Sequence, residues 1–138
     1  MAKQAEELEC WQLADKLRAE VIAICEQPRA AKHLRFCDGF TDAAGSVCRN
    51  IEEGFGRYYS AQIVQFFGYA LASLNEVQDY LHECTLRKFI DQPRFDELTD
   101  LTEHCRAKSL NFMRYHEAKL PPDRPKQAGK PRRRPKGR

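Results

Sequence analysis

The chain has 138 residues, 42% of them hydrophobic, which fits one compact domain. Residues 1–118 carry 14 Lys and Arg against 19 Asp and Glu, a net charge of −5, whereas residues 119–138 carry 9 against 1, a net charge of +8. No apolar run reaches the length of a signal peptide or a membrane span, which argues against a secreted or membrane protein, so we expect a cytoplasmic one.

Two helices are predicted in the first half of the chain. Apolar residues recur every three or four positions over residues 5–26, and Pro28 follows the end of this pattern. A second helix is predicted over residues 34–54, although Gly39 and Gly45 each cost about 1 kcal/mol relative to alanine inside a helix. Its first half has the weaker pattern.

Two more helices are predicted in the second half. Ser60 is the expected N-cap of a helix that reaches about Lys88, because apolar residues then alternate spacings of four and three. Pro93 suits the first turn of a fourth helix. The apolar positions of the third helix are Ile63, Phe67, Ala70, Leu74, Val77 and Leu81; those of the fourth are Phe95, Leu98, Leu101, Cys105 and Phe112.

Four long helices with short connections predict an all-α fold, an antiparallel up-and-down four-helix bundle, over residues 1–118. Residues 119–138 hold five of the seven prolines and no aromatic residue, so we expect a disordered basic arm. The third helix carries a second stripe beside its seam, which either self-association or a broad core could cover. This second stripe consists of Phe66, Tyr69, Ser73, Tyr80 and Cys84.

The segment between the second and third helices suggests a structural turn. Its two glycines permit positive φ, which suits a helix C-cap and a tight reversal. An arginine there has two candidate carboxylate partners, one in the turn and one on the third helix. We favour a structural role, in which this segment joins the second and third helices, over a ligand site, because paired charges also arise in purely structural networks. The residues concerned are Asn50, Glu53, Gly54, Gly56, Arg57 and Glu76.

The same segment resembles the S-[VI]-x-x-N-I-x-E-G-x-G-R pattern of the 23S rRNA-intervening sequence proteins, also known as four-helix bundle proteins. The matches are Ser46, Asn50, Ile51, Glu53, Gly54, Gly56 and Arg57. Residues 66–76 are similar to the third-helix segment of that family, and Trp11 with Ala14 also fits. The resemblance covers residues 8–116. The chain departs from it at Thr41-Asp42, where basic residues are common, and at Glu52, where a small residue is usual.

The resemblance implies a bundle that assembles as a homopentameric ring, similar to the accessory protein of diversity-generating retroelements, which is associated with a reverse transcriptase and binds nucleic acid. It implies no enzymatic activity. The departures, together with the acidic charge of the body, shift any phosphate binding towards the arm. A reverse transcriptase or another protein is then a possible partner.

No catalytic, cofactor or metal site is predicted. A di-iron bundle needs two E-x-x-H motifs, and only Asp79-x-x-His82 approximates one. His82 with Cys84, and His104 with Cys105, point to different helix faces and cannot chelate zinc well. The two-glycine turn lacks the G-K-[ST] of a phosphate loop. The six cysteines lie on predicted helices, so we expect reduced and mostly buried thiols.

The arm has the one independent functional signal. Its cations lie among prolines that keep a chain extended, which suits electrostatic binding of RNA or DNA; a solubilising tail is the alternative. Our main hypothesis is a non-enzymatic nucleic-acid-binding oligomer. A scaffold that docks a nucleic-acid enzyme is the alternative, and a metal-dependent bundle enzyme a weaker third. The candidate contacts are Lys126, Lys130, Arg132, Arg133, Arg134, Lys136 and Arg138, with Arg49 and Arg57 in the body.

Overall fold

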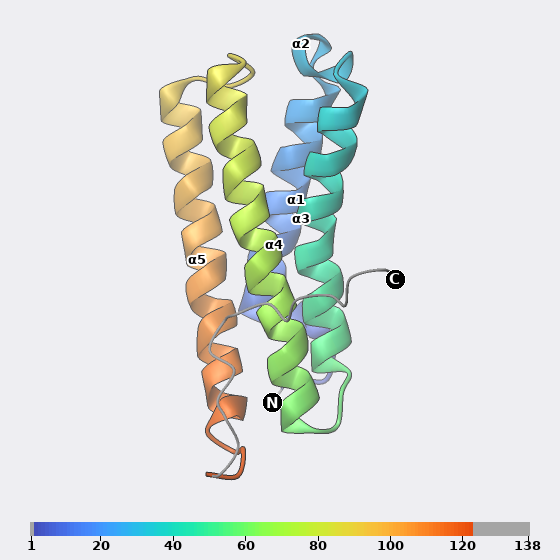
Figure 1. Cartoon of the computed structure of the whole chain (residues 1–138), viewed down its shortest axis with the longest axis vertical. Helices are drawn as coiled ribbons and strands as arrows, with labels where there is room; N and C mark the ends of the chain where they lie inside the picture. The colour runs from blue at the N-terminus through green and yellow to red at the C-terminus, as the bar shows by residue number, and fades with distance from the viewer. Residues whose placement is uncertain (1, 123–138) are drawn as a thin grey trace, which may run out of the picture.

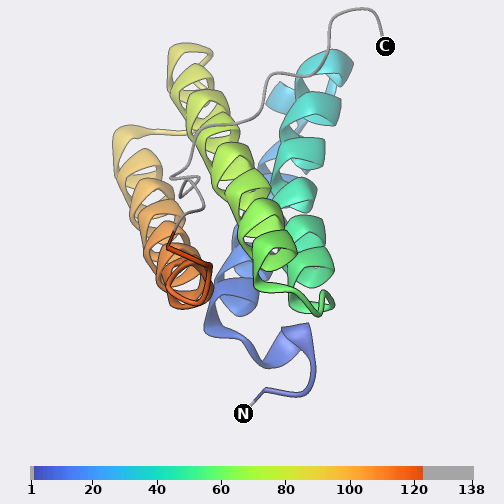
Figure 2. The same ribbon diagram turned by 60° about the horizontal axis from the view of Figure 1, so that its bottom comes forward.

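The computed structural model describes residues 2–122, and its main elements are four long helices (Figure 1). They are α1 (Glu9–Glu26), α3 (Leu34–Phe55), α4 (Ser60–Leu86) and α5 (Gln92–Glu117); a 3₁₀ turn, η1 (Ala5–Glu7), and the short helix α2 (Pro28–Ala31) complete the elements. Successive long helices run antiparallel, and α1 and α4 each pack against both α3 and α5 (Figures 1 and 2). The predicted antiparallel four-helix bundle is therefore confirmed, and residues 2–122 contain no strand.

The first helix begins later than predicted. Residues 5–7 form η1 as a separate turn, and Leu8, with φ −75° and ψ 134°, breaks the helix before α1 starts. The other end agrees with the sequence, because Gln27 is extended and Pro28 follows it, as expected for a residue that precedes proline. The helix α2 between residues 28 and 31 was not predicted.

The caps of α4 and α5 also differ in detail from the prediction. Tyr59, with extended backbone, is the N-cap of α4, and Ser60 is already its first helical residue without a capping hydrogen bond. At the start of α5, the Asp91 side chain accepts a hydrogen bond of 3.0 Å from the backbone N–H of Arg94. Such a cap contributes about 1 kcal/mol to stability and fixes where α5 begins.

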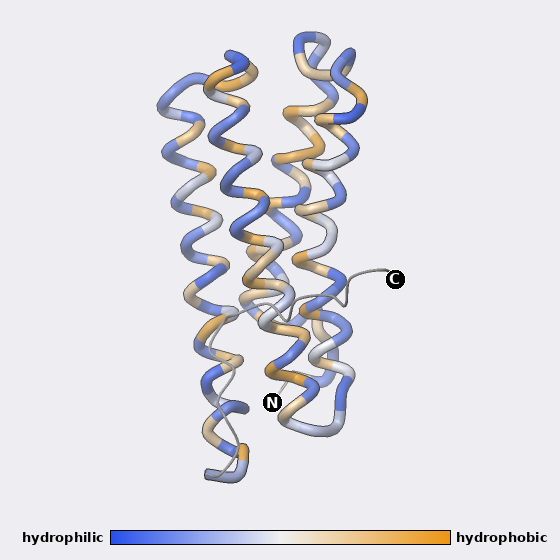
Figure 3. The backbone as a smooth tube through the Cα atoms, in the orientation of Figure 1, coloured by the Kyte–Doolittle hydropathy of each residue, from blue (hydrophilic) through white to orange (hydrophobic). Residues whose placement is uncertain are grey.

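The core lies along the inner faces of all four long helices, where orange segments face one another and blue segments face outward (Figure 3). Its largest fully buried side chains include Phe40, Phe67, Leu17, Leu74 and Leu81. Burying one such side chain contributes about 1.5–3 kcal/mol. Among residues 2–122, no helix combines the length and the apolar character that crossing a membrane requires.

Most of the second stripe on α4 is covered by α3 of the same chain. Ser73 and Cys84 are buried, and the Tyr80 ring stacks on Phe40 at a centroid distance of 5.3 Å. Gly39 makes this packing possible, since a Cβ there would overlap the Tyr80 hydroxyl. The structure therefore realises the broad-core alternative at these positions. Within the stripe, Tyr69 in the first half of α4 is the one exposed side chain.

Candidate functional site

The junction between α3 and α4 brings together the two sequence segments that resemble the family pattern. Asn50 Nδ2 donates hydrogen bonds to the Ser46 carbonyl at 2.8 Å and to Ser46 Oγ at 3.0 Å. Ser46 Oγ lies 2.9 Å from Ser73 Oγ on α4. This chain of hydrogen bonds satisfies the buried Ser73 hydroxyl, and it joins the two helices at one register.

The structure confirms the predicted C-cap at Gly56, but neither glycine of the turn has the predicted positive φ. Gly56, the C-cap of α3, has φ −74° and ψ −7°, and no positive φ occurs at Gly54. Gly54 is instead a buried helical residue that lets α4 approach closely. A Cβ at Gly54 would lie 2.9 Å from Phe67 Cδ1 and 3.0 Å from Phe66 Cβ, whereas a Cβ at Gly56 would meet nothing closer than 3.5 Å. Close helix packing is thus the reason for the first glycine.

Arg57 closes the turn through two contacts. Its guanidinium pairs with the Glu53 carboxylate four residues earlier, and it lies over the Phe66 ring at 4.8 Å from the centroid. Glu76, the alternative partner, is exposed and lies about 24 Å further along α4 than Ser60, so it is not the partner of Arg57. The geometry supports the structural role of this segment.

Arg49, the other body candidate for binding phosphates, also has a carboxylate partner. Its Nη2 lies 2.9 Å from Asp42 Oδ1, and the two side chains are 58% and 76% exposed. An exposed pair of this kind contributes at most about 1 kcal/mol, so a strong polyanion could displace it. Asp42 belongs to one of the departures from the family pattern, and the structure shows that it lowers the net charge around Arg49.

The second departure has a structural role that sequence reasoning missed. Glu52 Oε1 accepts a hydrogen bond of 2.8 Å from Trp11 Nε1, which ties the start of α1 to the end of α3. Both positions stood out in the sequence, but nothing in their spacing of 41 residues indicates that they meet.

The arm candidates lie outside the described residues. They are Lys126, Lys130, Arg132, Arg133, Arg134, Lys136 and Arg138. The described part of α5 ends at Glu117, at the same end of the bundle as the α3–α4 junction (Figure 2).

In the part of the chain that the structure describes, no three metal-ligating side chains lie close enough together to hold a metal ion. All six cysteines are free; four are buried and two, Cys25 and Cys37, are half-buried. Burial raises the pKa of Cys10 to about 11 and that of Cys105 to about 12, so these thiols are protonated and poor nucleophiles at neutral pH. His104 Nε2 lies 3.6 Å from a carboxylate oxygen of Glu9, at the protein surface.

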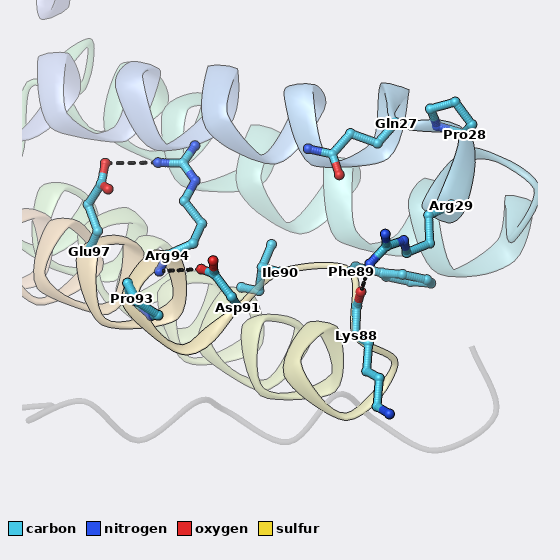
Figure 4. Close-up of a pocket in the computed structure, with 10 residues that line it drawn as sticks. All are labelled: Gln27, Pro28, Arg29, Lys88, Phe89, Ile90, Asp91, Pro93, Arg94 and Glu97. Carbon is cyan, nitrogen blue, oxygen red and sulfur yellow. Dashed lines mark hydrogen bonds and ion pairs between the residues drawn. The ribbon is translucent and has the colours of Figure 1, made fainter.

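A groove of about 1050 Å³ opens at the other end of the bundle, between the α1–α2 connection and the α4–α5 loop (Figure 4). Arg94 crosses one side of this groove and pairs with Glu20 of α1 and, at 2.8 Å, with Glu97. Arg29 reaches across the other side. Sequence reasoning did not predict this groove, because its two walls come from segments about 60 residues apart.

Comparison with protein families supports the resemblance. The family model described as 23S rRNA-intervening sequence protein matches residues 6–111, well over half of the chain, including both segments of the α3–α4 junction. No curated protein and no solved structure gives a significant match. The matched region spans the four long helices except for the last turns of α5. The chain therefore belongs to the 23S rRNA-intervening sequence protein family.

Proposed function

We propose that this protein is a non-enzymatic homo-oligomer that binds RNA or DNA electrostatically through residues 119–138. The observation that supports the proposal is the separation of charge along the sequence, with a net +8 in these 20 residues and −5 in the other 118. A polyanion is repelled by most of the body and attracted by this segment. Binding of this kind releases counterions, so it weakens steeply with salt and depends little on base sequence.

The body arginines are secondary contacts in this proposal. Arg57 is held by Glu53 and Phe66, and Arg49 by Asp42. A phosphate would have to compete with a carboxylate at each of them. The seven basic residues from Lys126 to Arg138 have only one acidic residue, Asp123, within the same 20-residue segment, so they supply most of the attraction.

Homo-oligomerisation, as a pentameric ring similar to the accessory protein of diversity-generating retroelements, is the second part of the proposal. Exposed aromatic residues near the α3–α4 junction support self-association. Tyr58 is 90% and Tyr59 66% exposed, and their rings meet edge to face with centroids 5.3 Å apart. Aromatic residues are enriched in protein interfaces, so an exposed pair is a suitable contact between subunits. In a ring, several basic segments would act on one nucleic acid, which raises affinity through avidity.

A cytoplasmic location belongs to the same proposal. Six cysteines without a disulfide are typical of a reducing compartment, where nucleic acids are also accessible.

Replacing the seven basic residues from Lys126 to Arg138 by glutamine in the full chain tests the proposal. We expect the variant to lose electrophoretic retardation of mixed-sequence RNA and DNA and to elute as the same oligomer in size-exclusion chromatography with light scattering. Retardation equal to that of the unchanged protein would refute the role of the segment. A monomer at micromolar concentration in both proteins would refute the assembly.

A scaffold that docks a nucleic-acid enzyme, such as a reverse transcriptase, is the second candidate function. The exposed pair Tyr58 and Tyr59 favours it, because aromatic residues are enriched in protein interfaces. The Tyr58→Ser, Tyr59→Ser variant should then lose binding to a purified reverse transcriptase encoded beside the gene, and the glutamine variant should keep it. The reverse result would exclude docking at this aromatic pair.

A further inference from the structure

A group of five cations occupies the end of the bundle opposite to the α3–α4 junction; we call it the basic cap. Residues 27–37 and 84–90 contain these five basic residues and no acidic residue, whereas the remainder of residues 1–118 has 9 basic against 19 acidic residues, a net charge of −10. Five of the 14 basic residues of residues 1–118 thus lie at one end of the body, bordered in sequence by the acidic residues Glu26, Asp38, Glu83 and Asp91. The basic cap consists of Arg29, Lys32, Arg35, Arg87 and Lys88.

The structure joins the two segments into one surface. Arg29 Nη1 donates a hydrogen bond of 2.8 Å to the Lys88 carbonyl, across the groove between α2 and the α4–α5 loop (Figure 4). Beneath this contact, the buried Phe89 ring packs against His33 and Phe36, with centroid distances of 5.3 and 5.5 Å. The cations of both segments are thus held on a common packed base.

Most of these charges have no partner within the body. Among residues 2–122, ion pairs of up to 4.0 Å involve Arg87, which lies 3.2 Å from Glu83, but none of the other four cap cations. Lys32 is exposed on the turn that precedes α3, and Arg35 is exposed in the first turn of α3. Four unpaired cations within one end of a small bundle repel one another, and a bound polyanion would relieve this repulsion.

Lys88 adds a second indication. Its φ of 60° lies in the left-handed region, where glycine or asparagine is usual at the end of a helix. Among residues 2–122, Lys88 is the one non-glycine residue with positive φ. This conformation is unfavourable for a lysine, because it brings the Cβ too close to the following carbonyl oxygen. A lysine in a position that favours glycine is consistent with a use for its charge.

Grooves on either side of the cap are of a size to seat a nucleic-acid strand. One has a volume of about 1050 Å³ and is lined by Arg29, Lys88 and Arg94 together with Asp91 and Glu97; the other has about 450 Å³ and is lined by Arg35 and Arg87 together with Glu83. Leu34, 72% exposed, lies in the wall of the smaller groove and offers an apolar surface on which a base could rest. A flat lipid surface could touch the cations but could not enter the grooves.

We propose that the basic cap is a second binding surface for the phosphate backbone of single-stranded nucleic acid, separate from residues 119–138. The 26-residue helix α5 runs between the two ends of the bundle and separates them by about 39 Å. A strand long enough to span this distance can therefore be held at both ends without close contact with the acidic side of the body. The cap is an addition to the proposed function, and it does not depend on the basic segment being active.

The test uses the full chain and two variants of equal charge. Lys32→Glu with Arg35→Glu alters the cap; Lys16→Glu with Arg114→Glu alters exposed cations elsewhere and changes the net charge by the same amount. Binding of fluorescein-labelled single-stranded RNA of about 30 nucleotides, which spans both ends, is followed by anisotropy over a range of salt concentrations.

We expect the cap variant to bind about tenfold more weakly than the control variant, with a slope of log affinity against log salt that is smaller in magnitude by about 1.4, because two phosphate contacts are lost. Equal affinities and slopes in the two variants would overturn the proposal. Binding to phosphatidylserine vesicles that requires Lys32 and Arg35, without a difference in RNA affinity, would overturn it as well, in favour of a lipid surface.

Two further variants keep the outcome interpretable. Lys32→Gln with Arg35→Gln removes the charges without adding acidic ones, so it should show part of the loss even if the glutamate variant folds poorly by circular dichroism; no loss there overturns the proposal. The seven-glutamine variant of residues 126–138 provides a separate background. If the cap substitutions still weaken RNA binding in this background, and the seven glutamine substitutions alone leave the RNA affinity unchanged, the cap is supported and the role of the basic segment is refuted.

Discussion

Replacing Gly54 by alanine tests whether close packing of α3 on α4 is the physical reason for the first glycine of the turn. The added Cβ would lie 2.9 Å from Phe67 Cδ1 and 3.0 Å from Phe66 Cβ, which is shorter than carbon atoms tolerate. The Phe67 ring has no room to yield, because it is fully buried and stacked on Phe112 with centroids 4.6 Å apart. The helices must therefore move apart locally.

The expected magnitude follows from two opposing terms. Overpacking of a core costs about 1–3 kcal/mol. Alanine gains about 1 kcal/mol over glycine inside a helix. We therefore expect Gly54→Ala to lower the free energy of unfolding by about 1 kcal/mol. Gly56→Ala is the matched control: its Cβ has space and its φ of −74° suits alanine, so it should be neutral or stabilising by up to about 1 kcal/mol.

Urea denaturation followed by circular dichroism, at one protein concentration, measures the difference between the two variants. Gly54→Ala should unfold at a lower urea concentration than the unchanged protein, and Gly56→Ala at the same or a higher one. If Gly54→Ala is as stable as Gly56→Ala, close packing of α3 on α4 does not explain why residue 54 is a glycine.

Three further predictions concern stability. Trp11→Phe removes the hydrogen bond to Glu52 and should cost about 1 kcal/mol in the same urea assay, whereas an unchanged midpoint would show that the bond contributes nothing. Lys88→Gly should stabilise by about 1 kcal/mol, because it relieves the left-handed backbone; a less stable variant would contradict that reasoning. Burial, with a smaller effect of Lys119, lowers the pKa of His116 below its ordinary 6.5. The unfolded chain then binds more protons below pH 6.5, so stability should fall on acidification through this range, and His116→Gln should reduce the loss.

The sequence predicted the helices well where apolar periodicity was regular and failed where a local interaction decided the boundary. The end of α1 and the extent of α3 agree with the pattern, since Pro28 stops one helix and the apolar spacing runs through the other. The start of α1 was wrong because Leu8 adopts an extended conformation that no periodicity reveals. The predicted N-cap of α4 was wrong by one residue, since Tyr59 and not Ser60 occupies that position.

The candidate sites show the same division. Arg57 and Glu53 are four residues apart, so their pairing could be predicted from local spacing. The role of Gly54 could not, because it depends on where Phe67 of another helix lies. Likewise, charge counts reveal that residues 27–37 and 84–90 are basic, but only the contact between Arg29 and Lys88 shows that these segments form one surface.

The sequence by itself determined the fold class, the family and the contrast between an acidic body and a basic C-terminal segment, because periodicity, motifs and charge are local properties of the chain. Tertiary structure alone decided that α3 covers most of the second stripe of α4, that Trp11 meets Glu52, and that five cations gather at one end. These features depend on how far each helix is rotated and shifted against its neighbours, which is set by the packing of all four helices together.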